Sequence, residues 1–299
     1  GIAQKRRGFK ALSENITNPL AIVEYLDNLY VAYDDKLGQV NLSTGSITDL
    51  TGVLAATSKP RFAVQAGSLF MTSDNGPRKV ETNSSSDSIR EVGVPTGLDL
   101  TVSLDSAADG ALEPDTQQAY RILFGRNDQN GNLLLGSPSE LTSITNPQED
   151  ATYSRAGTTV TVTTSSPHGL TGTWLVKITE ADDTGLEIAS TLATYASSTT
   201  FTYVSTATGT TTGDLKWGYF RNADLNFTIP DGLTTDYFYQ VYRSQPSLTD
   251  DTTPEENLQL VEQRTLTSSE ISNGYVDYED SLQKELLGAA LYTNPNQEG

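Results

Sequence analysis

The sequence lacks several residue types that protein chemistry commonly uses. Its 299 residues include no cysteine, one histidine, one methionine and two tryptophans. Without cysteine the chain forms neither disulfide bonds nor thiolate metal sites, so its stability must come from packing, to which assembly with other subunits can add. One histidine cannot supply the set of imidazoles found in zinc sites. No apolar run approaches the roughly 20 residues that a membrane-spanning helix needs.

Positive charge is also scarce. The chain has 19 basic and 38 acidic residues, and its formal net charge is −19. Binding to nucleic acid along the whole chain is disfavoured, because such binding depends on cations that replace counterions on phosphates. Adhesion to anionic membranes is disfavoured for the same reason. Two interpretations of the acidity stay open: it keeps the protein soluble, or it forms a wall along which a polyanion slides without sticking.

The residues that are abundant favour β-structure. Hydrophobic residues make up 36% of the chain, below the usual globular range, while 14 Tyr and 8 Phe are spread along it. Strands that have one face in water need fewer apolar residues than fully buried elements do. The length allows two or three domains. We therefore predict an all-β protein.

Residues 1–92 have the pattern of a β-meander. Two short strands within residues 22–33 flank the predicted turn pair Asp27-Asn28, and a similar run follows at residues 61–72. Short strands joined by polar turns are the unit of a propeller blade or of an up-and-down sheet. We predict a partial, propeller-like meander here.

Residues 93–152 and 218–286 predict one β-sandwich that an insertion interrupts. Residues 98–104 alternate apolar and polar side chains, as a half-buried strand does. Residues 237–243 have the pattern of a later strand of the same fibronectin type III-like sandwich. The prediction is therefore a sandwich formed by two separate stretches of the chain.

The insertion, residues 153–217, is rich in threonine. Its strand-forming runs at residues 158–164, 174–179 and 199–204 predict a nested β-module, which at about 65 residues is near the lower size limit for folding alone. Residues 287–299 return to the style of the first stretch. The chain begins without methionine and ends abruptly, which indicates a piece of a longer polypeptide.

Helix signals are sparse. Residues 281–287, followed by Gly288, predict a short helix with a glycine cap. Residues 267–271 predict a single capped turn. Neither segment changes the all-β prediction.

The single histidine, His168, lies in a Pro-His-Gly-Leu turn at residues 167–170. A Ser-His-Asp triad needs one histidine, yet no Gly-x-Ser-x-Gly elbow is present. We therefore interpret His168 as a structural turn residue between two strands.

Asp128, Asn130 and Asn132 imitate the start of a calcium-binding loop. Leu133 stands where such a loop needs glycine, and Ser139 stands where it needs the bidentate glutamate. A hairpin tip rich in Asn and Gly accounts for these residues without an ion.

Paired acids raise the question of glycosidase chemistry, which needs two carboxylates about 5 to 10 Å apart across a cleft. The pairs lie in polar loop sequence, where solvated and ionised carboxylates are the favoured interpretation. They are Asp182-Asp183, Asp250-Asp251 and Glu255-Glu256. We assign no catalytic, cofactor-binding or metal-binding residue, and we predict that the protein is not an enzyme and has no cofactor.

Basic residues concentrate in the first third of the chain. Lys5, Arg6 and Arg7 form a cluster, and Arg61, Arg78 and Lys79 add to the positive charge of this region. Two interpretations stay open: a basic arm that docks on an acidic neighbour or on packaged DNA, or a solvated terminus.

Several of these stretches resemble virion proteins of short-tailed bacteriophages. Residues 5–9 (Lys-Arg-Arg-Gly-Phe), followed by 26–32, resemble the start of phage tail-nozzle (tail tubular) proteins. Residues 93–139 are similar to the fibronectin-type sandwich inserted in many of them. Residues 160–162, 167–170 and 198–203 resemble a small β-module common in phage structural proteins. Residues 239–244 and 291–295 resemble the return to the body of the tail-nozzle proteins.

The resemblance implies a ring of identical subunits, commonly six, at the distal end of the tail of a virion. Such a ring forms a conduit for genome ejection and a mount for fibres or spikes. Its expected partners are further copies of the chain and other tail proteins, namely an adaptor and fibres or spikes. The resemblance also implies that DNA passes through the ring without specific binding and that no membrane is involved.

Two other functions stay open from the residues themselves. The first is a surface adhesin or carbohydrate-binding β-sandwich protein, which would use exposed Tyr and Trp in sandwich loops. The second is a glycan-degrading enzyme, which only the acidic pairs support.

Overall fold

The computed structural model describes residues 16–56, 58–65, 67–82, 87–106, 110–128, 131–249 and 257–291. The chain divides into two compact units. The first consists of Gly1–Val94 with Arg126–Leu134, and the second consists of Pro95–Gly125 with Leu135–Gly299. Antiparallel sheets dominate both units, which confirms the all-β prediction.

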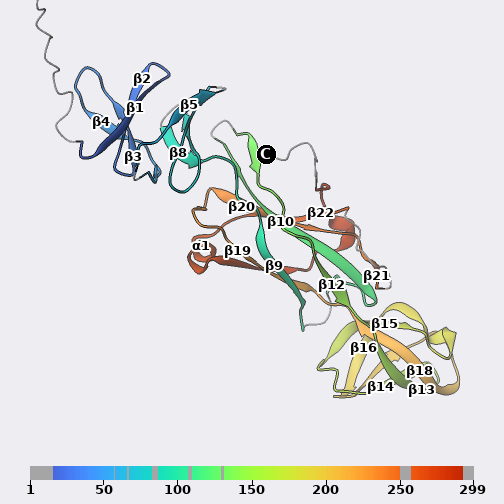
Figure 1. Ribbon diagram of the computed structural model, residues 1–299. Coiled ribbons are helices and arrows are strands. Elements are labelled where there is room, and N and C mark those ends of the chain that lie inside the picture. The colour runs from blue at the N-terminus through green and yellow to red at the C-terminus, as the bar shows by residue number, and fades with distance from the viewer. Residues whose placement is uncertain are drawn as a thin grey trace, which may run out of the picture. The chain divides into compact units, whose positions relative to one another are not determined.

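The first unit contains two consecutive four-stranded meanders (Figure 1). In each, the strands pair in the order in which they follow one another along the chain. The first sheet consists of β1 (Pro19–Tyr25), β2 (Asn28–Tyr33), β3 (Lys36–Val40) and β4 (Ile47–Asp49). The second consists of β5 (Phe62–Gln65), β6 (Ser68–Met71), β7 (Arg78–Thr82) and β8 (Asp87–Glu91).

The first hairpin turns one residue earlier than the sequence predicts. Tyr25 pairs with Asn28, so the loop consists of Leu26 and Asp27, whose φ angles are 47° and 58°. Two consecutive left-handed residues match the right-handed twist of the flanking strands. Asn28, expected in the turn, is therefore the first residue of β2.

One apolar core joins the two meanders. Tyr25 on β1 donates a hydrogen bond of 2.6 Å to the carbonyl of Gly67, and the Tyr30 hydroxyl on β2 lies 2.6 Å from a carboxylate oxygen of Asp87. The core residues are Tyr25, Tyr30, Ala32, Leu37, Leu50, Leu54, Ala56, Leu69, Met71, Val80 and Ile89. The meander prediction is confirmed, but the described residues form no propeller: they supply two sheets that share one core.

Two sheets packed face to face lie mainly in the second unit, and the tip of the β10-β11 hairpin belongs to the first. The larger sheet has the order β11-β10-β20-β22, with β12 and β21 also paired to β10, and the smaller has the order β23-β19-β9. Their strands are β9 (Leu98–Leu104), β10 (Thr116–Asn127), β11 (Leu133–Leu135), β12 (Thr142–Asn146), β19 (Ala223–Thr228), β20 (Tyr237–Arg243), β21 (Ser247–Leu248), β22 (Gln259–Thr265) and β23 (Tyr275–Asp280).

Aromatic side chains fill the space between these two sheets. The ring centroid of Phe227 on β19 lies 6.1 Å from that of Phe124 on β10 and 5.2 Å from that of Tyr239 on β20. All three side chains have no exposed surface. β20 is buried along its whole length, because Tyr242 on its other side packs with Ala119, Leu123, Leu258 and the partly buried Leu260.

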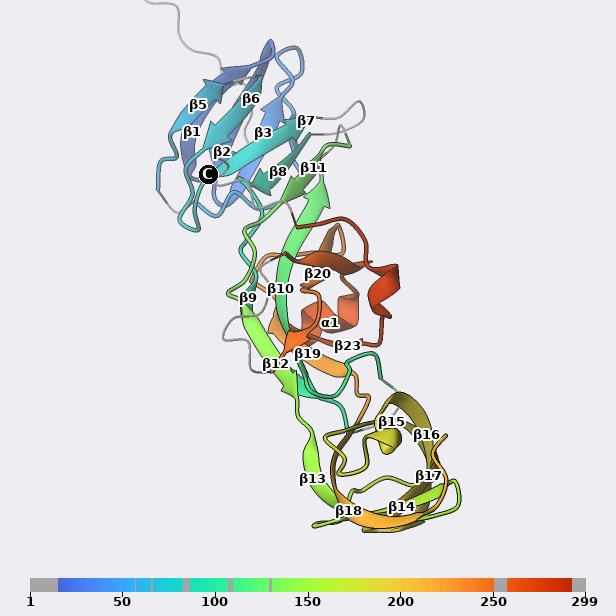
Figure 2. The same cartoon turned by 90° about the vertical axis from the view of Figure 1, so that its right-hand side faces the viewer.

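The threonine-rich insertion forms a closed six-stranded barrel, whose strands run around a ring in Figure 2. The order is β13-β14-β17-β16-β15-β18. The bounds are β13 (Glu149–Ala156), β14 (Thr159–Thr164), β15 (Thr173–Thr179), β16 (Ile188–Ser197), β17 (Thr200–Val204) and β18 (Thr210–Tyr219), with the 3-10 turn η1 (Thr184–Leu186) after β15. Inward side chains, among them Trp174, Phe201 and Trp217, fill the interior.

The barrel leaves and rejoins the sandwich at one place. Glu149 at the start of β13 lies opposite Trp217 near the end of β18. Just before β13, the side-chain amide of Asn146 donates hydrogen bonds of 3.0 Å to the carbonyls of Leu112 and Tyr219. The buried Asn146 therefore ties both ends of the insertion to the sandwich.

One helix prediction is confirmed and one is wrong. The capped turn is the helix α1 (Ser268–Asn273), where Thr267 and Glu270 form a reciprocal capping box. In residues 281–287 the only helical element is the 3-10 turn η2 (Lys284–Leu286). Neither α1 nor any other helix within the described residues has the length and apolar character to cross a membrane.

The described part of the final segment bonds to the second unit. The N–H of Gly288 donates to the carbonyl of Leu260 at 2.8 Å, and that of Leu291 donates to the carbonyl of Leu258 at 2.7 Å. Residues 292–299 lie outside the described residues. The return of 287–299 to the first domain stays a prediction.

Candidate functional site

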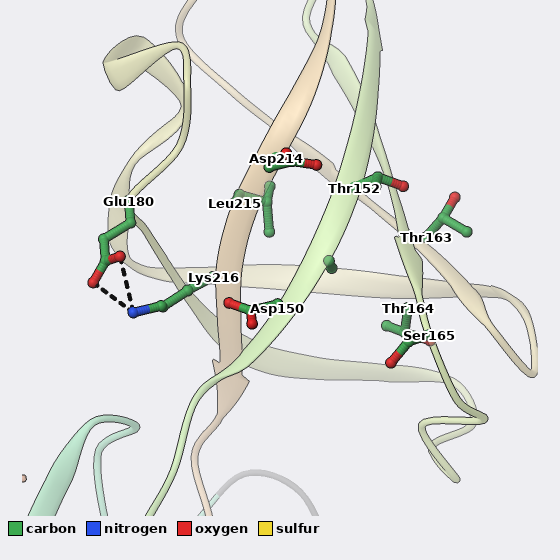
Figure 3. A pocket seen from close by; sticks show the side chains of 10 residues that line it. Asp150, Thr152, Thr163, Thr164, Ser165, Glu180, Asp214, Leu215 and Lys216 are labelled. Atoms are coloured by element: carbon green, nitrogen blue, oxygen red, sulfur yellow. Dashed lines mark hydrogen bonds and ion pairs between the residues drawn. The ribbon is translucent and has the colours of Figure 1, made fainter.

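A shallow groove of about 650 Å³ lies on the outer wall of the barrel (Figure 3). Because side chains alternate along each barrel strand, every second residue of β13, β14 and β18 points outward. The groove is lined by Asp150, Ala151, Thr152, Thr163, Thr164, Ser165, Glu180, Asp214, Leu215 and Lys216. Its lining is thus polar, with carboxylates, hydroxyls and one ammonium group.

The ammonium group of Lys216 is held by Glu180. The distance from its Nζ to each oxygen of that carboxylate is 2.9 Å. The hydrogen bond to Glu180 is the main cause that raises the pKa of Lys216, and the charges of Glu180 and Asp150 add to it. Lys216 is therefore protonated at neutral pH, a state in which it can attract an anion or donate hydrogen bonds but cannot act as a base or nucleophile.

The hydroxyl groups of the groove continue across neighbouring strands in rows. Thr152 on β13 lies opposite Thr163 on β14 and Asp214 on β18, and Thr163 lies opposite Thr200 on β17. A hydroxyl both donates and accepts hydrogen bonds. This surface therefore suits contact with a polar partner rather than the burial of an apolar ligand.

His168 lies at the wall of the barrel interior with both ring nitrogens engaged. Its Nδ1 accepts a hydrogen bond from the N–H of Leu170, so Nε2 carries the proton and donates to the carbonyl of Ser197 at 2.9 Å. Its ring contacts those of Trp174 and Phe201. Backbone groups thus occupy the atoms that a catalytic base would need.

Both side chains of the acidic pair at residues 182–183 bind groups of the barrel itself. Asp182 accepts a hydrogen bond of 2.8 Å from the N–H of Asp214. Asp183 caps the turn η1 by accepting from the N–H of Gly185, and it forms an ion pair of 2.9 Å with the buried Arg155. The other two predicted pairs, at residues 250–251 and 255–256, lie outside the described residues.

The calcium-like sequence forms a hairpin tip. The two carboxylate oxygens of Asp128 accept from the backbone N–H and the side-chain amide of Asn132, each at 2.8 Å. Asn130 lies outside the described residues. Across the described ranges, no group of three or more His, Cys, Asp or Glu side chains has the arrangement of a metal site.

Two of the basic residues singled out by the sequence lie in ion pairs. Arg78 pairs with Glu91 at 2.7 Å, and Lys79 pairs with Glu81 at 2.9 Å. Residues 5–7, the core of the predicted basic arm, lie outside the described residues.

Sequence reasoning missed a buried carboxylate in the first unit. Arg126 donates to both oxygens of Glu81, at 2.6 and 3.0 Å, and Lys79 approaches the same carboxylate. Burial raises the pKa of Glu81, but the hydrogen bonds from Arg126 and Lys79 outweigh burial and leave the pKa lowered. No local pattern predicts this pair, because the partners are 45 residues apart in sequence.

Comparison with protein-family models, with curated proteins and with solved structures gives no match.

Proposed function

We propose that this protein is a structural component of a bacteriophage tail, a nozzle or adaptor subunit that assembles into a ring around the ejected genome and carries fibres. The proposal takes from the sequence the resemblance to short-tailed phage proteins, and it places the protein in the virion. It also includes the assignment of the two packed sheets as a fibronectin type III-like sandwich.

The arrangement of the second unit is the observation that carries the proposal. A sandwich with a buried aromatic core bears a closed barrel, inserted between β12 and β19. A closed barrel has no free strand edge, and its interior is filled with side chains. Such modules present defined surfaces to neighbours, which is what an assembly subunit needs.

The state of the polar groups also supports a structural role. Acidic residues that could serve chemistry instead form ion pairs or caps, as Asp183 does with Arg155 and the turn η1. His168 uses both ring nitrogens on backbone groups. Lys216 is paired with Glu180 and protonated.

The test is the assembly state of the purified chain. Sedimentation and negative-stain electron microscopy should show a concentration-dependent oligomer with rotational symmetry, because heterologous contacts between identical subunits close into rings. A particle that stays monomeric at every concentration reached would contradict the proposal.

The groove of the barrel supports a second candidate, a carbohydrate-binding adhesin. Its hydroxyls and carboxylates, such as Thr152, Thr163 and Asp150, match the hydrogen-bonding groups of a sugar. A glycan array probed with the intact chain tests this candidate. Binding that Asp150→Asn and Asp214→Asn abolish together, in a monomeric protein, would favour the adhesin over the tail subunit.

A further inference from the structure

The outer face of the sheet β23-β19-β9 is open and acidic. Leu225, Phe227 and Val276 point into the sandwich core, so the residues between them point away from it. On the outer side Asp224 lies opposite both Glu279 and Ser103, and Asn226 lies opposite both Asp277 and Thr101. We call these six outward residues the acidic sheet face.

The three carboxylates of this face are those of Asp224, Asp277 and Glu279. Asp224 and Glu279 are direct cross-strand neighbours, an arrangement of like charges that destabilises a sheet. The side-chain amides of Asn222 and Asn226 donate to Glu279 and Asp277 at 2.6 and 2.7 Å, but amides are neutral. Within the part of the chain that the structure describes, no lysine or arginine forms an ion pair with these three carboxylates.

Two other acidic side chains of the same unit do have cationic partners. Asp280, one residue beyond Glu279, is paired with Arg243, and Glu113 is paired with Lys177. Partial burial raises the pKa of Asp224, and the neighbouring carboxylates, first that of Asp105, raise it further. A cation brought to the face from another molecule would relieve this repulsion.

The shape of the face suits an extended segment. Its surface is hollowed by about 440 Å³ along Thr101, Ser103, Asp224 and Asn226. At one end of the face, Leu98 and Tyr275 are 47% and 42% exposed, although they flank the same residue, Thr228. An occupant would therefore combine several cations with at least one apolar side chain.

The chain itself contains one segment of that composition. Residues 5–10 read Lys-Arg-Arg-Gly-Phe-Lys, so four of the 19 basic residues and one aromatic residue fall within six positions. We infer that the acidic sheet face is the docking surface for residues 5–10 of a second copy of this chain. The cations would lie over Asp224, Asp277 and Glu279, and Phe9 would contact Leu98 and Tyr275.

This inference rests on the self-assembly proposed above and gives it a contact. A terminal segment of one copy on a sheet face of the next is a heterologous contact, which repeats from copy to copy until the ring closes. Because the contact is electrostatic, it weakens as salt increases.

The experiment uses a fluorescent peptide of residues 1–15 and the full chain as receptor. The receptor carries Lys5→Gln, Arg6→Gln, Arg7→Gln and Lys10→Gln, so that its own segment does not compete. Fluorescence anisotropy should show saturable binding. Replacing Asp224→Asn, Asp277→Asn and Glu279→Gln together in this receptor should weaken binding roughly tenfold or more, as expected for the loss of several charge pairs.

A matched control replaces three exposed acids of the same unit, Glu140→Gln, Asp231→Asn and Glu285→Gln. The control has the same change in net charge, so its affinity should stay within about twofold if the face is specific. Equal weakening in both variants would overturn the inference. Circular dichroism of each receptor shows whether it is folded.

An exchange of charges between receptor and peptide provides a second test, which holds even if the neutral variants misfold. A receptor with Asp224→Lys and Glu279→Lys should lose the natural peptide and bind a peptide that carries Arg6→Glu and Arg7→Glu. Failure of this exchange in a folded receptor would also overturn the inference.

Sedimentation separates this inference from the proposed function. Rings formed by the natural chain that persist in the Asp224→Asn, Asp277→Asn and Glu279→Gln variant would overturn the docking surface and leave the proposed function standing. A natural chain that never self-associates would overturn both.

Discussion

Arg243 on β20 and Asp280 at the end of β23 connect the two sheets of the sandwich through an ion pair of 2.6 Å. Both side chains are almost fully buried. The same carboxylate oxygen of Asp280 accepts from the hydroxyl of Tyr120, and its other oxygen accepts from the N–H of Leu282. Burial, followed by the charge of Asp280, raises the pKa of Tyr120 well above its usual range, so this hydroxyl stays protonated as a donor.

We predict that Asp280→Ala lowers the free energy of unfolding of the second unit by about 3–5 kcal/mol, because it leaves the guanidinium of Arg243 buried without its counter-charge. Arg243→Met combined with Asp280→Ala should be less destabilised than the sum of the two single changes. Urea unfolding of the four proteins measures this coupling. The exposed Asp231→Ala is the control and should shift stability by less than about 0.5 kcal/mol. If the double variant is destabilised by the sum of the two single effects, Arg243 and Asp280 do not stabilise each other, and the prediction is wrong.

The lowered pKa of Glu81 predicts a pH-dependent contribution to the first unit. The folded pKa lies below the unfolded value of 4.5, so the stabilisation is complete above that pH and is lost as the pH falls through the folded pKa. Glu81→Gln should cost about 3 kcal/mol at pH 7, and its difference from the natural chain should shrink in acid. Hydrogen exchange of β7 and β8 against pH measures it; a difference that is constant down to pH 3 would refute the prediction.

Both tryptophans of the chain, Trp174 and Trp217, lie in the barrel core, so tryptophan emission reports this module alone. Phe201 is fully buried and contacts both indoles, with centroid distances of 5.8 and 5.0 Å. Phe201→Ala should therefore destabilise the emission-monitored transition by about 3–5 kcal/mol. The outward Thr202→Ala serves as the control. Because β1–β8 belong to the first unit, we expect their hydrogen exchange to stay unchanged, and a parallel loss of protection there would contradict this expectation.

The capping box of α1 gives a smaller, local prediction. The hydroxyl of Thr267 accepts a hydrogen bond from the N–H of Glu270, and the carboxylate of Glu270 accepts one from the N–H of Thr267. Thr267→Ala should cost about 1 kcal/mol, whereas Thr267→Ser, which keeps the hydroxyl, should cost less. Thermal unfolding measures the difference, with Ser269→Ala as the control. If Thr267→Ala and Ser269→Ala lower the stability equally, loss of the cap is not the cause of the effect of Thr267→Ala.

The sequence predicts those elements whose signals are local. The alternation of Thr159–Thr164 and the capping residues Thr267 and Glu270 are each readable within a few positions, and the structure has the strand and the helix there. Residues 281–287 misled because Gly288, expected as a helix cap, instead donates through its N–H to the carbonyl of Leu260 on β22.

Barrel closure and the charged contacts are not local and could not be predicted. Closure depends on the pairing of β15 with β18, in which Val176 lies opposite Tyr219 and Thr179 lies opposite Lys216. These partners are about forty residues apart in the sequence, so no local pattern predicts their pairing. The opposition of Asp224 and Glu279 depends equally on the register of two distant strands. Composition shows that the chain is acidic, but only the register shows where the acids meet.

Because Glu149 and Trp217 are cross-strand partners, the barrel begins and ends at neighbouring positions and is separable from the sandwich. Since the polypeptide enters and leaves it through neighbouring strands, a short turn that joins residues 148 and 218 would bridge the gap and leave the connectivity of β12 to β19 intact. A designed protein could therefore carry another module at the same two positions of the sandwich.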